Sequence, residues 1–418
     1  MEGRTRRRDE ILRSAEGLFA RDGYRVTSMR EVAAASGILA GSLYHHFPSK
    51  EAIAVELVEE YHAALVRVVR ESPATGTDPV AALRAFARDI AEVSRRHQAA
   101  VKISVYDAPV TASPSLKTAV RSLPASLDRH WRTLISAAAS AGAIDRRVDT
   151  RVLRHVLRCV TLQTGVMVWE RGEPAGGAAA VADCTTSIIF DGLAAGTLPR
   201  SDSEGKSAAI RVVDEARARW AEETTGERHT RPGQILDTAR ELFAQRGFEA
   251  TTVRDIADAC GVQAGNLYRY FPSKDAMVAD ILSRFSDRLS QAYQDVIGAG
   301  SSATETLEAL CWLLNQAARH FRHEIEILKG PTRMLSLGLG DHYREGAQAR
   351  YAMLVGLIES GTASGELSDL ADPALVASCV REIMWSPMKP LALISPTRVK
   401  EFCRAAVLEG AATERPRQ

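Results

Sequence analysis

Apolar side chains recur along the chain at the spacing of amphipathic helices, and the same stripe occurs twice. Residues 11–19 hold Ile, Leu, Ala, Leu and Phe at positions i, i+1, i+4, i+7 and i+8, and residues 235–243 repeat these types at the same positions. A period of 3.6 residues places them on one face of a helix. Gly23 and Gly247 end the two stripes. The pattern predicts a helix with a buried face at the start of two related segments.

Two short helices are expected after each stripe. Ser28 precedes Glu31 by three residues, and Thr252 precedes Asp255 by three. This spacing is the signature of a capping box at a helix start. A glycine then breaks the chain for a tight turn in each segment.

A third helix should follow each turn, from about Ala40 to Phe47 and from about Ala264 to Phe271. A proline ends each one, and Ser49 and Ser273 are suited to cap a long fourth helix. Two short helices joined by a glycine turn form a helix-turn-helix. In such a unit the second helix enters the major groove of DNA, while neighbouring groups hold phosphates.

The resemblance between the two segments extends beyond these helices. Residues 37–50 (GILAGSLYHHFPSK) reappear as residues 261–274 (GVQAGNLYRYFPSK), an offset of 224. Residues 142–149 also resemble residues 365–372, at an offset of 223. Because the spacing persists over a hundred residues, a whole unit of roughly 200 residues has been duplicated.

The sequence therefore predicts an all-α fold of two repeats, each with a helix-turn-helix head and a helical body. The expected ranges are 1–50 for the first head, 51–198 for the first body, 199–227 for a partly helical linker, 228–274 for the second head and 275–418 for the second body. The two repeats most simply pack as an internal pseudo-dimer.

Composition is that of a globular protein, with 45% hydrophobic and 25% charged residues. A net charge of +1 argues only weakly against nucleic-acid binding, since phosphate affinity depends on where the positive charge lies. Basic side chains gather at the start of each head: Arg4, Arg6, Arg7, Arg8 and Arg13 in the first, and Arg228, His229 and Arg231 in the second.

No run of about 18 apolar residues suggests a membrane span, and the N-terminus lacks the apolar stretch of a secretory signal, so we expect a cytoplasmic protein. Six cysteines lie far apart without a Cys-x-x-Cys pair: Cys159, Cys184, Cys260, Cys311, Cys379 and Cys403. This pattern predicts scattered core thiols and no disulfide framework or zinc site.

The run from the first helix through LYHHFPSK and LYRYFPSK resembles the head of the TetR family of one-component repressors. The resemblance implies that the Tyr of the third helix and the Lys of the fourth hold the DNA backbone, and that residues around that Tyr read bases. The implied phosphate contacts are Tyr44, His46, Lys50, Tyr268 and Lys274, with Ser28 and Thr252 adding hydroxyl or amide contacts. The implied base contacts are Leu39, Ala40, Ser42 and His45 in the first head and Gln263, Ala264, Asn266 and Arg269 in the second, while Arg30 and Arg254 reach bases or phosphate.

The two reading helices differ in chemistry. Asn266 and Arg269 suit adenine and guanine edges, whereas the first head offers shorter groups at these positions. Two unlike heads on one chain predict an asymmetric operator. The alternatives are that one head is a scaffold and the chain dimerises on a palindrome, that the protein coats DNA without sequence preference, or that it only sequesters a small molecule.

The bodies are helical by pattern. The resemblance implies that their last two helices form a dimer interface and that the middle helices enclose an effector pocket. Interface candidates are the helices from Asp149 to Trp169 and from Asp372 to Trp385 and their successors, with Leu153, Val156, Val160, Met167, Leu375, Cys379 and Ile383 on the apolar face.

Candidate pocket residues are Phe86, Tyr106, His130, Trp131 and Trp169 in the first body and Trp312, Phe321, Met334, Tyr343, Met353 and Met384 in the second. Ordinary core packing is the competing interpretation for each of them. The methionines of the second repeat suit a lipid-like or aromatic effector. Ligand binding in a body would tilt the fourth helix and release the repressor from DNA.

Enzymatic chemistry is not indicated. The chain has no glycine-rich phosphate loop, nucleophile elbow or paired catalytic carboxylates, and no cofactor is expected. His320 and His323 beside Glu324 share a helical face, but no further ligand is visible, so no metal site is predicted.

Overall fold

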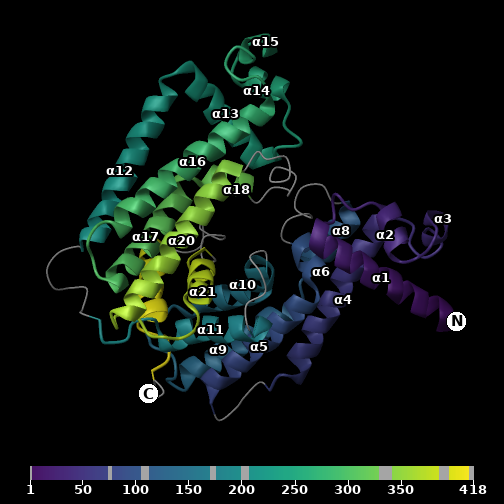
Figure 1. Cartoon of the computed structure of the whole chain (residues 1–418), viewed down its shortest axis with the longest axis horizontal. Coiled ribbons are helices and arrows are strands. Elements are labelled where there is room, and N and C mark those ends of the chain that lie inside the picture. The colour runs from purple at the N-terminus through teal and green to yellow at the C-terminus, as the bar shows by residue number, and fades with distance from the viewer. Residues whose placement is uncertain are drawn as a thin grey trace. The chain divides into compact units, whose positions relative to one another are not determined.

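The chain is described by a computed structural model in which helices form the whole framework (Figure 1). The structure describes residues 2–73, 78–104, 113–169, 176–198, 207–328, 341–385 and 395–413, and their side chains except those of 2–5, 164–169 and 396. The all-α prediction is confirmed. Two compact units are present: residues 1–144 with 154–186, and residues 145–153 with 187–418.

The first repeat holds α1 (Glu2–Asp22), α2 (Met29–Ala35), α3 (Ala40–Leu43), α4 (Lys50–Glu71), α5 (Pro79–Arg96), α6 (Gln98–Lys102), α8 (Pro114–Arg121), α9 (Ala125–Ser140), α10 (Thr150–Trp169) and α11 (Gly177–Asp191). The second holds α12 (Ala208–Arg228), α13 (Arg231–Arg246), α14 (Val253–Ala259), α15 (Ala264–Leu267), α16 (Lys274–Ile297), α17 (Ala303–His320), α18 (Arg322–Leu328), α20 (Asp341–Ala363), α21 (Pro373–Trp385), α22 (Pro396–Phe402) and the π-helix η3 (Cys403–Leu408). None of the helices described is long and apolar enough to cross a bilayer.

The first head packs through the stripe seen in the sequence. Ile11 and Phe19 of α1 are fully buried, and α1 contacts α2, α4 and α6. Ser49 caps α4, its hydroxyl accepting from the Ala52 amide at 3.1 Å. α4 begins beside the head and then packs on α5, α8 and α9, so it runs from the head into the body.

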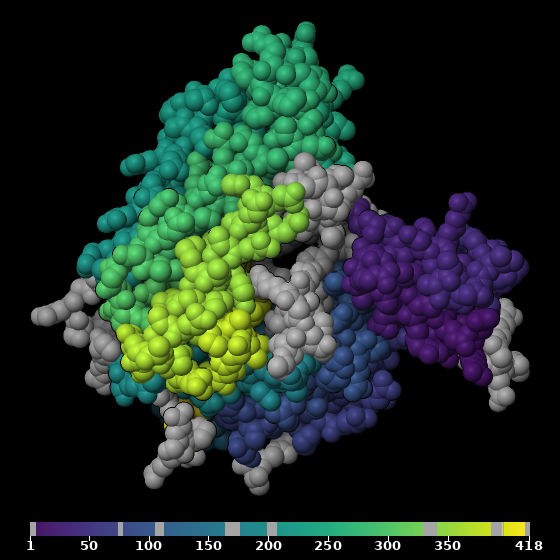
Figure 2. Space-filling model, viewed as in Figure 1, coloured from purple at the N-terminus to yellow at the C-terminus, as the bar shows by residue number. Residues whose placement is uncertain are grey.

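The stretch expected to be a partly helical linker forms α12 and packs into the second unit. Its apolar side chains Ile210, Val213 and Trp220 are buried, and the helix contacts α16, α17 and α13. Trp220 lies with its ring 5.0 Å from the ring of Phe321. The head of the second repeat, α13–α15, lies at one end of this unit (Figures 1 and 2).

Equivalent segments at the ends of the two repeats exchange main-chain hydrogen bonds within the second unit. The Leu193 amide donates to the Val407 carbonyl at 2.9 Å, and in the opposite direction the Ala411 amide donates to the Ile189 carbonyl at 2.8 Å. The next residues repeat the exchange, Ala194 to Leu408 and Ala412 to Phe190, each at 2.9 Å. Residues 189–194 and 407–412 are therefore paired reciprocally.

A second reciprocal pair joins the turns that precede α10 and α21. The Asp145 amide donates to the Ala411 carbonyl at 2.8 Å, and the Ser368 amide donates to the Leu193 carbonyl at 2.8 Å. Asp145 and Ser368 occupy equivalent repeat positions, 223 residues apart. Such exchange of identical contacts is the mark of an isologous, two-fold interface.

Glycine allows the two segments to approach this closely. Gly192 and Gly410 have φ of +83° and +82°. A Cβ at Gly192 would lie 2.5 Å from the Leu408 carbonyl oxygen, and one at Gly410 would lie 2.5 Å from the Asp191 carbonyl carbon. Any larger residue would force the segments apart.

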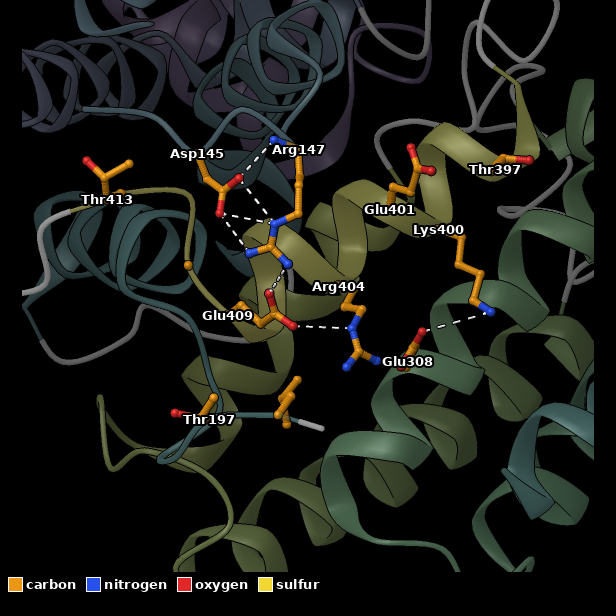
Figure 3. A pocket seen from close by; sticks show the side chains of 13 residues that line it. Asp145, Arg147, Thr197, Glu308, Thr397, Lys400, Glu401, Arg404, Glu409 and Thr413 are labelled. Carbon is orange, nitrogen blue, oxygen red and sulfur yellow. Dashed lines mark hydrogen bonds and ion pairs between the residues drawn. The ribbon is translucent and has the colours of Figure 1, made fainter. Parts of the chain in front are cut away.

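Ion pairs and a disulfide extend the same region. Arg147 lies between Asp145 (2.7 Å) and Glu409 (2.6 Å), as Figure 3 shows. Arg404 then joins Glu409 (3.2 Å) to Glu308 of α17 (2.8 Å). Contrary to the prediction of unpaired thiols throughout, one disulfide links α17 to η3, between Cys311 and Cys403. The other four cysteines form no disulfide.

Candidate DNA-reading surfaces

The second helix of each head begins with the capping box that the spacing predicted. The Ser28 hydroxyl accepts from the Glu31 amide at 3.3 Å, and the Thr252 hydroxyl accepts from the Asp255 amide at 3.1 Å. Hydrogen bonds from Ser28 and Thr252 lower the pKa of the Glu31 and Asp255 carboxyls. Both carboxylates are therefore held ionised at a helix N-terminus, which they stabilise.

The third helices are shorter than predicted. Regular helix ends at Leu43 in α3 and at Leu267 in α15, and the following residues continue as a tighter turn. In the first head the His45 amide donates to the Ser42 carbonyl at 3.2 Å, an i to i−3 bond. Phe47 and Phe271 are buried anchors beyond this turn. The expected extension to the phenylalanines was wrong because the chain must turn there to enter the fourth helix.

Large apolar side chains are exposed on these two surfaces. Leu39 is 80% exposed, Tyr44 54% and Tyr268 55%. Their exposure leaves these side chains accessible to a binding partner. In both repeats the exposed Tyr follows the buried Leu of the third helix directly, so the helix turns one face to the core and one to solvent.

The other predicted contact residues are exposed or half-buried. Those exposed are Ser28, Arg30, Ser42 and His45 in the first head and Thr252, Arg254, Gln263, Asn266 and Arg269 in the second. Ala40, His46 and Ala264 are half-buried. Most of the candidate set is therefore accessible to a partner, and DNA contact by these residues stays a prediction.

Lys50 and Lys274 donate hydrogen bonds to main-chain carbonyls, which the sequence did not reveal. The Lys50 ammonium donates to the carbonyls of Tyr24 (2.7 Å), Arg25 (3.0 Å) and Thr27 (2.7 Å). The Lys274 ammonium donates to the carbonyls of Phe248 (2.7 Å) and Thr251 (2.9 Å). In each head the fourth helix is therefore fastened to the loop between the first two helices.

Two exposed residues were missed by sequence reasoning. Tyr270 is 38% exposed, and the Arg269 guanidinium lies 5.8 Å from the centre of its ring. Val26, 64% exposed, precedes α2. Both residues lie close in sequence to predicted contacts, and this position could have identified them. The exposure of a single apolar residue cannot be read from a sequence.

Three candidate pocket residues of the first body form one aromatic cluster. The Phe86 ring lies 4.6 Å from His130 and 4.7 Å from Trp131. His130 Nε2 lies 3.0 Å from the Ser72 hydroxyl, and burial lowers the pKa of the imidazole. The buried indole nitrogen of Trp131 has no hydrogen-bond partner. Tyr106 and the side chain of Trp169 lie outside the described residues.

The candidates of the second body fall in different places. The Phe321 and Tyr343 rings both contact Phe285, at 5.0 Å and 5.8 Å. Trp312 instead lies 6.0 Å from the Lys400 ammonium. Met353 is half-buried and Met384 is buried, and Met334 lies outside the described residues.

A charged cavity of about 940 Å³ lies in the second unit beside the Arg147–Glu409 ion pair (Figure 3). It is lined by charged and hydroxyl side chains, among them Glu308, Lys400 and Thr413. This lining does not suit a hydrophobic effector. Over the described residues, no group of three His, Cys, Asp or Glu side chains is placed to hold a metal.

The proposed interface helices begin as predicted. Asp149 and Asp372 cap α10 and α21, each accepting from the amide two residues on, at 2.8 Å and 3.0 Å. Their apolar residues Leu153, Val156, Val160, Cys379 and Ile383 are buried, and Leu375 is half-buried. The side chain of Met167 is outside the described set.

Comparison with known proteins agrees with the geometry. The family described as "Bacterial regulatory proteins, tetR family" matches twice, at residues 11–57 and 235–281. The "HTH-type transcriptional repressor KstR2" of Rhodococcus jostii is 33% identical over 204 residues, 96% of that protein and 46% of this chain. The chain belongs to the TetR family. It is a DNA-binding transcriptional regulator of the TetR repressor type.

Other relatives match in the same proportion. KstR2 of Mycolicibacterium smegmatis is 32% identical over 194 residues, 95% of that protein and 46% of this chain. Among solved structures, "ketosteroid transcriptional regulator KstR2 of Mycobacterium tuberculosis" is 30% identical with a TM-score of 0.41, covering 44% of this chain and 96% of that one. Each of the two KstR2 repressors thus matches about half of this TetR chain over nearly the whole of its own length.

Proposed function

We propose that this chain is a repressor that reads an asymmetric operator with two unlike heads and leaves it when a small hydrophobic effector binds in a body. The heads comprise residues 1–50 and 228–274, and the bodies 51–198 and 275–418. One chain then does what two identical subunits do in a dimeric regulator.

The reciprocal hydrogen bonds between residues 189–194 and 407–412 carry this proposal. Contacts repeated in both directions between equivalent segments are what a two-fold dimer makes. Here both segments belong to one chain. This supports an internal pseudo-dimer, which presents one head of each kind to one operator.

The difference between the heads supports asymmetry of the operator. At three equivalent positions the first head exposes Leu39, Ser42 and His45, and the second exposes a Gln, an Asn and an Arg. Amide and guanidinium groups make bidentate contacts with adenine and guanine, which the first head's groups do not. The two half-sites are therefore expected to differ in sequence.

The aromatic cluster of the first body supports a hydrophobic effector. Trp131 and Phe86 are buried, and the indole N–H of Trp131 lacks an acceptor. A buried donor left unpaired is costly, so a ligand with an acceptor atom would be favoured there. A lipid-like or aromatic compound with one polar group fits this chemistry.

The fourth helices would transmit the effect. Lys50 and Lys274 fasten each fourth helix to its head, so a tilt of α4 or α16 moves the reading surface with it. The effector releases DNA only if it binds the DNA-incompetent arrangement more tightly than the competent one.

Selection of bound sequences from a random duplex pool, with the mass of the complex measured in solution, tests the proposal. One chain on an asymmetric site is the expected result. Two chains on a palindrome would reject the internal pseudo-dimer, and binding governed by salt without sequence preference would reject specific reading. No DNA binding at all would leave a small-molecule sequestering protein.

A further inference from the structure

The guanidinium of Arg8 in α1 contacts both α4 and the residues that follow α3. Its Nη1 donates to the His46 carbonyl at 2.6 Å, and its Nε donates to Glu56 of α4 at 3.0 Å. A second hydrogen bond runs from Nη2 to the other Glu56 carboxylate oxygen. The guanidinium also lies over the Phe47 ring, 4.1 Å from its centre. Arg8 of α1 thus connects the end of the reading segment to α4.

The reading helix needs such a contact. α3 has four residues, and Leu39 at its N-cap makes no side-chain capping bond. A helix of one turn has no stability of its own and takes its place from its neighbours. The exposed Tyr44 and His45 come directly before the carbonyl that Arg8 holds. Fixing that carbonyl fixes the direction of the two side chains.

We infer that Arg8 is a positioning residue for base reading by the first head, with Glu56 as its anchor. This rests on the proposed function, because it requires that α3 read DNA. Arg8 stands in the basic N-terminal run that the sequence assigned to phosphate attraction. The guanidinium instead donates hydrogen bonds to the Glu56 carboxylate and the His46 carbonyl.

The second head shows that the contact is not a general requirement of the fold. The positions equivalent to Arg8 and Glu56, 224 residues on, are Pro232 and Asp280. Pro232 has no charged group, and Asp280 pairs with Arg284 one turn along its own helix at 3.0 Å. The Arg8–Glu56 contact is therefore made at these positions of the first repeat and not at the equivalent positions of the second. Asp280 provides a matched control.

The substitution Glu56→Gln gives the sharpest test. Removing a negative charge from a DNA-binding head should strengthen binding if electrostatics alone acts. If Glu56 holds Arg8 in place, Glu56→Gln should instead weaken binding of the full-length protein to the pool-selected duplex by about tenfold. This change is typical of one lost charged hydrogen bond. Discrimination against base changes in the half-site read by Ser42 and His45 should fall by a similar factor. Equal or tighter binding by Glu56→Gln would overturn the inference.

Arg8 variants separate positioning from phosphate contact. Arg8→Gln should weaken binding without changing the slope of log K against log salt, whereas a lost phosphate contact lowers the slope by about 0.9. Arg8→Lys keeps the charge but lacks the fork, so it should bind as weakly as Arg8→Gln. Full rescue by Lys, or a slope lowered in Arg8→Gln, would contradict the inference.

The controls distinguish the possible failures. Arg7→Gln removes a charge from the same helix, where Arg7 pairs with Glu10 at the surface, and should keep discrimination intact. Asp280→Asn should not weaken binding. A thermal melt of each variant reports loss of fold, which would lower binding to all duplexes equally. If His45→Ala also leaves discrimination unchanged, the first head does not read DNA and the proposed function fails; if only the Glu56 and Arg8 variants are silent, this inference fails alone.

Discussion

Arg240 and Glu324 form a buried ion pair, 2.8 Å apart, between the first helix of the second head and α18 of its body. Their side chains are 10% and 7% exposed. Burial raises the pKa of Glu324, and the charge of Arg240 opposes that rise. In the first head the position equivalent to Arg240 is Glu16, so the two heads meet their bodies through groups of opposite charge.

Removing one partner of this pair should loosen the second head. Arg240→Met leaves the Glu324 carboxylate buried without its charge partner, and such loss costs about 3–5 kcal/mol. Hydrogen exchange of α13 amides should accelerate accordingly, while the double variant Arg240→Met with Glu324→Leu should recover most of the protection. Arg246→Met, which breaks an exposed pair of 3.9 Å, is the control and should change little. A double variant as unprotected as Arg240→Met would refute this account.

The first head should lose stability as pH rises from about 4.5 to about 7. Burial and the charge of Glu60 raise the pKa of Glu16 to about 7, and His97 Nδ1 lies 4.0 Å from its carboxylate. Because the folded-state pKa lies above the ordinary glutamate pKa of 4.5, Glu16 contributes most stability below pH 4.5 and loses it as pH rises to about 7. Hydrogen exchange of α1 should show the wild type losing protection relative to Glu16→Gln over that window. Curves that stay parallel would show that Glu16 does not titrate between the two states.

The Lys50 ammonium should hold the loop between α1 and α2. Lys50→Met removes three hydrogen bonds to carbonyls of that loop. Amides of residues 23–28 should then exchange faster, whereas Tyr44→Phe, which alters only an exposed side chain, should leave them unchanged. The salt dependence of DNA binding in the same variant measures any phosphate contact separately. Unchanged exchange in Lys50→Met would mean that the loop is held by other contacts.

Features set by residues close in sequence were predictable, and those set by distant residues were not. The caps at Ser28 and Thr252 were visible because donor and acceptor are three residues apart. The Lys50 ammonium bonds carbonyls 23 to 26 residues away, and Cys311 bonds Cys403 across 92 residues. Local sequence patterns do not show which residues so far apart in the chain will pair. The sequence therefore predicted a set of candidate reading residues, but it did not reveal the long-range contacts of the heads that hold them.

Exchanging the reading residues should change the symmetry of the operator. Gln263→Leu, Asn266→Ser and Arg269→His give the second head the exposed set of the first. Each bidentate base contact contributes about 1–3 kcal/mol of discrimination, so the preferred second half-site should change and come to resemble the first as an inverted repeat. Repeating the duplex selection with this triple variant measures the outcome. An unchanged second half-site would show that these three residues do not read bases.

Reduction of the Cys311–Cys403 disulfide should destabilise the second unit. Both cysteines are buried, and the bond closes a long loop between α17 and η3. In the chain-entropy model, a cross-link that closes a loop of 92 residues stabilises the folded state by about 4.6 kcal/mol. The melting temperature of the wild type should therefore fall in a reductant, and that of Cys311→Ser should start lower and not respond. Cys379→Ser, which removes a buried thiol outside the disulfide, is the matched control and should still respond. Equal melting of the wild type with and without reductant would show that the disulfide adds no stability beyond the other contacts between η3 and α17, among them the Arg404–Glu308 ion pair.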